Sequence, residues 1–163
     1  MDKPATSSEI GRVVAISALI GGAFALLAFF VLPMTSMGLI GSTTGAAVAG
    51  HASGDVGLML LWLAPLAGAT IGSLGAWLQF GTAATPIGRR KASVAILVSA
   101  MVVAGVYLVL LVRIETLLGQ AGSLLGGLHA MDLLGAGFWL VLLAVVAPGV
   151  AAVVYLLTTS PAE

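Results

Sequence analysis

Four side chains with the capacity to bind a metal ion stand just before two apolar segments. His51 and Asp55 occur in "HASGD", and His129 and Asp132 occur in "HAMD". Two imidazoles and two carboxylates would suit zinc if the two stretches met in the fold. We interpret these residues instead as solvated loop residues that mark a membrane interface. No metal site is therefore predicted, and a metal or pigment site at these four residues is the alternative.

Few polar side chains occur inside the apolar segments: they are Ser17, Thr70, Ser73, Gln79 and Ser99. A hydroxyl without a neighbouring base is a poor nucleophile, and serines in membrane helices usually bond to backbone carbonyls. The chain contains no cysteine, which excludes disulfides, thiolate metal sites and cysteine nucleophiles. It also has no glycine-rich phosphate loop. We predict no catalytic residue, no cofactor and no enzymatic activity.

The composition indicates a lipid environment. Of the 163 residues, 60% are hydrophobic and 7% are charged, against about 45–50% apolar and about 25% charged in an average soluble domain. Six Lys and Arg balance six Asp and Glu, so there is no concentrated positive surface for nucleic acid. Membrane lipids are the predicted surroundings.

Four uncharged apolar runs are long enough to cross a bilayer, which takes about 20 residues. They occupy residues 13–32, 58–80, 94–112 and 133–157. The sequence therefore predicts one all-α membrane domain, residues 1–163, folded as a four-helix transmembrane bundle. Residues 33–57 and 113–132 would be loops on one side of the membrane, and residues 81–93 would be a loop on the other. Pro65 and Pro148 fall inside spans and predict bends there.

The basic residues predict the orientation, because Lys and Arg favour the cytoplasmic side of short loops. Lys3 and Arg12 precede the first span, and Arg89, Arg90 and Lys91 lie between the second and third, whereas only Arg113 lies on the other side. We predict a multi-pass protein of the cell membrane, typical of a bacterial inner membrane, with both termini in the cytoplasm. Arg89, Arg90 and Lys91 are also candidates for contact with anionic lipid headgroups, although orientation alone explains them.

Small residues recur every four positions along the first two spans. In lipid, such stripes let helix backbones approach and gain dispersion contacts. We predict that the two stripes meet, either within one chain or between chains. They comprise Ser17, Gly21 and Ala25 in the first span and Ala64, Gly68, Gly72 and Ala76 in the second.

The two long outer loops differ in character. In residues 35–49, short and β-branched side chains surround a Gly41-Ser42 turn signal, which predicts a small β-hairpin, with a disordered loop as the alternative. In residues 114–128, apolar residues recur at helical spacing and predict a helix lying on the headgroups. Its glycines would weaken that helix.

Three short motifs carry a resemblance to known four-span proteins. The "LPM" that opens the first long loop and the "GLMLLW" that enters the second span resemble the claudin-like tetraspan arrangement, and "GAGFWL" is similar to the fourth span of small bacterial four-span proteins. The resemblance implies a left-handed four-helix bundle with a small extracellular β element that contacts other proteins. Claudins have a tryptophan and two cysteines in this loop. Here Thr35 follows Met34 and cysteine is absent, so paracellular sealing is not implied.

These features favour a non-enzymatic accessory or assembly subunit that packs with other membrane-protein subunits. Its predicted docking surface comprises residues 35–54 and 114–128. One alternative is a small channel or transporter lined by Thr70, Ser73 and Gln79, which would require a homo-oligomer because four helices enclose little volume. A second alternative is a membrane enzyme, or a metal- or pigment-binding protein, that uses the outer His and Asp residues. Nucleic acid is not a predicted partner.

Overall fold

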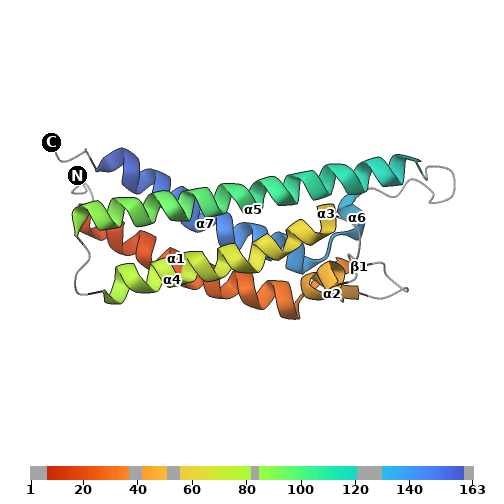
Figure 1. Cartoon of the computed structure of the whole chain (residues 1–163), viewed down its shortest axis with the longest axis horizontal. Coiled ribbons are helices and arrows are strands. Elements are labelled where there is room, and N and C mark those ends of the chain that lie inside the picture. Colours follow the sequence, from red (N-terminus) through yellow and green to blue (C-terminus); the bar gives the residue numbers. More distant parts are fainter. Residues whose placement is uncertain (1–6, 37–41, 51–55, 82–84, 121–129, 160–163) are drawn as a thin grey trace, which may run out of the picture.

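Four long helices run along a common direction and form an elongated bundle (Figure 1). The computed structural model describes residues 7–36, 42–50, 56–81, 85–120 and 130–159. The long helices are α1 (Ser7–Val31), α4 (Leu63–Phe80), α5 (Pro86–Gln120) and α7 (Ala136–Thr158). In the part of the chain that the structure describes, these four are long and apolar enough to cross a membrane. The predicted all-α, four-span membrane fold is therefore confirmed.

The short elements gather at one end of the bundle (Figure 1). They are β1 (Pro33–Ser36), β2 (Ser42–Thr44), α2 (Gly45–Gly50), α3 (Val56–Met59), the 3₁₀ turn η2 (Leu60–Trp62) and α6 (Ala130–Leu133). We call this the hairpin end. The opposite end, where α1 begins and α7 ends, is the terminal end.

The interior of the bundle is apolar. Helix α1 packs against both α4 and α7, and α5 packs against α7 and α4. The largest fully buried side chains include Phe29, Leu61, Ile71, Ile96, Val103, Tyr107 and Val145. Ser93 is also buried, and its hydroxyl donates to the carbonyl oxygen of Arg89 at 3.0 Å. Apolar side chains therefore fill the centre of the described bundle and leave no polar path through it.

Helices α1 and α4 approach each other at glycines. A Cβ added at Gly22 would lie 2.5 Å from the carbonyl oxygen of Gly68 and would also overlap Gly72. One added at Gly75 would lie 2.9 Å from the carbonyl oxygen of Ala15. Only a glycine fits at such distances, so the two backbones are in direct contact.

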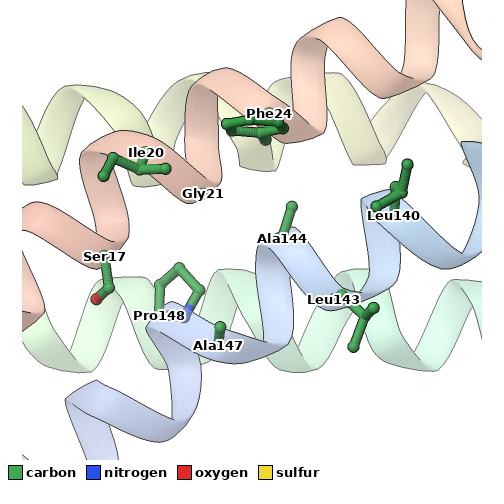
Figure 2. A pocket seen from close by; sticks show the side chains of 9 residues that line it. All are labelled: Ser17, Ile20, Gly21, Phe24, Leu140, Leu143, Ala144, Ala147 and Pro148. Carbon is green, nitrogen blue, oxygen red and sulfur yellow. The ribbon is translucent and has the colours of Figure 1, made fainter.

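The face that α1 turns toward α4 differs from the predicted stripe. A Cβ at Gly21 would overlap the carbonyl oxygen of Ala144 on α7 (Figure 2), so within one chain Gly21 faces the fourth span, whereas a Cβ at Gly68 would lie 3.2 Å from Ala25, so these two members of the predicted stripes do meet. The residues of α1 in contact with α4 include Ala15, Ala18, Gly22 and Ala25. These residues are alternately three and four positions apart, which matches the roughly 3.6 residues per turn of an α-helix. Residues spaced strictly four apart shift gradually around the helix and leave the shared face.

Helix α5 is longer at both ends than the predicted third span. Residues 86–93 and 113–120, which were predicted as loops, are helical. At the start, the Thr85 hydroxyl accepts a hydrogen bond from the Gly88 amide at 3.1 Å, and Pro86 takes the first helical position, where an amide donor is not needed. Charged residues limit the segment that can lie in hydrocarbon, but they do not stop a helix. The length of the uncharged run, residues 94–112, is therefore shorter than α5.

One further prediction is corrected by these helix boundaries. Residues 114–120 continue α5 and do not begin a separate helix on the headgroups, and residues 121–128 lie outside the described part. Pro65 lies inside a continuous helical stretch made of α3, η2 and α4, three residues after η2 ends, and Pro148 lies inside α7. The bends predicted at these two prolines stay predictions.

Candidate functional site

The segment after α1 forms the predicted β-hairpin. Strands β1 and β2 pair in antiparallel fashion, with Thr35 opposite Thr43 and Ser36 opposite Ser42. The hydroxyl oxygens of Thr35 and Thr43 are 2.6 Å apart, a cross-strand pair of the kind that stabilises sheets. Residues 37–41, which connect the strands and include Gly41 of the turn signal, lie outside the described part of the chain.

Helix α2 folds the hairpin back onto the bundle. The Thr44 hydroxyl accepts a hydrogen bond from the Ala47 amide at 3.3 Å and thereby caps the start of α2. Gly45 lies against Phe29 and Met34, where a Cβ would be 2.6 Å from the Phe29 ring. Met34 and Ala49 are both buried. Much of the first long loop is thus anchored to α1.

The start of α7 holds β1 from its other side. The Gly135 amide donates to the carbonyl oxygen of Met34 at 2.8 Å, and Thr35 forms an antiparallel bridge with Leu134. A Cβ at Gly137 would lie 2.9 Å from the carbonyl oxygens of both Leu32 and Pro33, so this approach requires glycine. We call these contacts the β1–α7 latch.

The latch gives the two strands different environments. Strand β1 has a partner on each edge, β2 on one and Leu134 on the other. Among the described residues, β2 pairs on one edge only, and Ser42 and Thr43 are exposed. Within the described ranges, the hairpin end therefore presents a β2 edge without a strand partner on a fixed support.

Aromatic rings surround the same end of the bundle. The ring of Phe29 lies 5.3 Å from that of Phe30 and 5.8 Å from that of Trp62. On the other side, the Phe138 ring lies 5.3 Å from that of Trp139. Amphipathic rings favour the boundary between hydrocarbon and water, and Trp62 and Trp139 are partly exposed. This placement fits a membrane boundary at the hairpin end.

The predicted outer His and Asp residues are only partly described. His51, Asp55 and His129 lie outside the described residues. Asp132 is exposed in α6 and interacts with another group of the chain. No group of three or more His, Asp or Glu that could hold a metal ion occurs within the described ranges. The metal or pigment site stays an untested alternative.

Hydroxyls within the spans bond to their own helices. The Ser17 hydroxyl donates to the carbonyl oxygen of Val14 at 3.1 Å, and the Thr70 hydroxyl donates to that of Leu66 at 2.9 Å. Thr70 and Ser73 lie on the exposed side of α4, Gln79 and Ser99 are half-buried, and none of these four is directed into a polar core. The structure therefore does not assemble these residues into a path within one chain.

Three of the basic residues, Arg89, Arg90 and Lys91, lie at the terminal end, where α5 begins. Arg90 and Lys91 are exposed, whereas Arg89 is half-buried. A Cβ at Gly11 would lie 3.6 Å from Arg89 Nη1 and 3.4 Å from the Tyr155 ring. The Arg89 guanidinium therefore lies beside Gly11 of α1, a contact that the sequence did not predict. Gly11 has no side chain and leaves room for the guanidinium, so it is the sequence feature that could have indicated this contact.

Comparisons with protein families, curated proteins and solved structures found no match to this chain. The claudin-like resemblance stays a prediction.

Proposed function

We propose that this polytopic membrane protein is a non-enzymatic accessory or assembly subunit that docks another membrane protein at its hairpin end. The observation that carries the proposal is the edge of β2 that has no strand partner among the described residues, on a hairpin held in place by α2 and by the β1–α7 latch. Unpaired backbone groups on a strand edge can accept an additional strand from a partner. Because the support is already folded, binding would not have to order it.

The chemistry of β2 suits such a contact. Its residues, Ser42, Thr43 and Thr44, include no charge and no proline, which are the usual means of protecting an edge. Short hydroxyl side chains also let another backbone approach. The partner surface is thus an extended segment of another protein that pairs with β2 through its backbone.

The basic residues support an orientation for this surface. Arg12, Arg89, Arg90 and Lys91 are found near the terminal end, and Arg113 near the hairpin end. In a bacterial inner membrane this bias favours cytoplasmic termini and a hairpin end outside. Arg90 and Lys91 would then face anionic headgroups of the inner leaflet.

A photo-crosslinking amino acid at position 42 tests the docking proposal in living cells. We expect a covalent adduct with one partner protein from Ser42→benzoylphenylalanine. The matched control is Met101→benzoylphenylalanine, because Met101 is 65% exposed on the membrane-facing side of α5 but far from β2 in sequence. Gly137→Val should reduce the adduct by forcing the latch apart. Absence of a protein adduct at position 42, in a chain that inserts normally, would contradict the proposal.

A second candidate function, an oligomeric channel or transporter, is favoured by one observation on α4. Thr70 and Ser73 lie on its exposed face, and this span is less apolar than the other three. A path for ions or solutes would have to form between copies of this chain. Ion or solute flux into vesicles that is abolished by Thr70→Val together with Ser73→Ala would support this function, and a monomeric chain without flux would exclude it.

A further inference from the structure

The Arg89 side chain lies where three helices meet at the terminal end of the bundle. The start of α1, the start of α5 and the end of α7 are found together there (Figure 1). A Cβ added at Gly11 of α1 would lie 3.6 Å from Arg89 Nη1 and 3.4 Å from Cε2 of the Tyr155 ring. The guanidinium from α5 and the ring from α7 therefore share one small volume beside α1. Arg89 is half-buried and Tyr155 is buried.

The guanidinium at this place has donors without acceptors. An arginine side chain carries five N–H donors and stays charged in proteins. Within the described ranges, the hydrogen bonds at Arg89 are those of its backbone amide and carbonyl, to Thr85 and Ser93. Glu9, in the first turn of α1, is exposed and interacts with another group. A charge that is partly removed from water is costly without a counter-ion, so this site favours an anion.

The position of the guanidinium along the helices selects the kind of anion. Gly11 lies two residues before the first uncharged run, residues 13–32, and Tyr155 lies two residues before the end of the fourth, residues 133–157. Since a helix rises about 1.5 Å per residue, both levels are within about 3 Å of the end of an uncharged run. The guanidinium is therefore at the boundary between hydrocarbon and water. At this boundary a bilayer presents the phosphate groups of its lipids.

The local charge favours a lipid with a net negative charge. A guanidinium binds phosphate through two parallel N–H donors. Arg12 directly follows Gly11 in α1, and its side chain is exposed. Arg90 directly follows Arg89 in α5 and is exposed as well. A zwitterionic lipid brings a cation of its own into this positive region, whereas an anionic lipid does not, so the anionic lipid is attracted more strongly.

We propose that Arg89 is the phosphate-binding group of a site for one anionic phospholipid, where α1, α5 and α7 meet. Its guanidinium binds the phosphate, and Arg12 and Arg90 add to the positive potential around it. This site differs from the general attraction of Arg90 and Lys91 to headgroups, because those side chains are exposed and Arg89 is half-buried beside Gly11. It is independent of the docking function proposed for the hairpin end.

Native mass spectrometry of the purified full chain tests this site. The protein in an uncharged detergent is incubated with equal amounts of phosphatidylglycerol and phosphatidylcholine, and the lipid retained by each chain is identified. We expect the parent to retain one phosphatidylglycerol several-fold more often than one phosphatidylcholine. An excess of glycerol 3-phosphate, which has a phosphate but no acyl chain, should leave this complex intact. Equal retention of the two lipids, or displacement by glycerol 3-phosphate, would overturn the proposal.

Two pairs of variants separate this site from general charge attraction. Arg89→Gln should lose the preference for phosphatidylglycerol, whereas Arg90→Gln removes the same charge from the exposed neighbour and should keep most of it. Gly11→Leu keeps every charge but fills the volume beside the guanidinium, so the preference should be lost again. Gly105→Leu is its control, because no atom lies within 4 Å of a Cβ added there. Equal losses in the two arginine variants, or an unchanged preference in Gly11→Leu, would contradict the assignment of Arg89.

Discussion

Tyr107 is the residue whose environment most needs an explanation. Its ring is 1% exposed and packs against Phe138, with ring centroids 4.6 Å apart. Its hydroxyl is buried and, among the described residues, has no hydrogen-bond partner. Such a group costs about 1–3 kcal/mol relative to a satisfied one. The ring, rather than the hydroxyl, must therefore account for the stability that Tyr107 contributes.

We expect Tyr107→Phe to unfold at the same temperature as the parent or at a higher one, because the ring contact is kept and the unpaired hydroxyl is removed. Tyr107→Leu should unfold at a lower temperature, since it loses the contact with Phe138. Thermal unfolding in mild detergent, followed by circular dichroism, measures both. A clear loss of stability in Tyr107→Phe would mean that the hydroxyl is bonded after all.

At the scale of helices and strands, the sequence predicted the elements better than their contacts. Uncharged runs located four spans, and Gly41 and Ser42 located the hairpin, because both signals are local. The face of α1 that meets α4 was missed by one residue, since Gly21 and Gly22 are equally small and only the packed bundle distinguishes them. The ends of α5 were missed because charge at Lys91 and Arg113 limits burial in lipid and not helix formation.

The contact between α1 and α4 should be sensitive to single methyl groups. Gly22→Ala and Gly75→Ala introduce a Cβ that meets backbone atoms of the facing helix, and overpacking of this kind costs about 1–3 kcal/mol. Gly105→Ala is the control, because no atom lies within 4 Å of its added Cβ and alanine favours a helix. We expect the first two variants to lower the unfolding temperature. If all three resemble the parent, the close contact is wrong.

At the scale of the whole molecule, the sequence could predict the topology but only part of the candidate site. The hairpin was predictable from residues close in sequence. The β1–α7 latch was not, because Met34 and Gly135 come together only when the first and fourth spans pack. Gly135 and Gly137 in "GAGFWL" were the sequence feature that could have indicated the latch. Two glycines permit a close contact, but the sequence alone does not show which segment makes it.

The orientation of the molecule can be measured with single cysteines, since the chain has none of its own. Ser42 is exposed at the hairpin end, and Ile87 is 67% exposed in the first turn of α5 at the terminal end. We expect Ser42→Cys to react with an impermeant maleimide in intact cells, and Ile87→Cys to react only after lysis, because the basic bias favours a cytoplasmic terminal end. The opposite pattern would invert the topology.

The β1–α7 latch also imposes an order on biogenesis. At about 5–20 residues per second, a ribosome takes about 5–20 seconds to add the roughly 100 residues between Met34 and Gly135. Throughout that interval β1 lacks its second partner, so the hairpin end reaches its final form only after the last span has been delivered to the membrane. A chain truncated after residue 120 should therefore keep a protease-sensitive hairpin, whereas the full chain should protect it. A partner that recognises the latched hairpin would assemble only with completely translated and inserted copies.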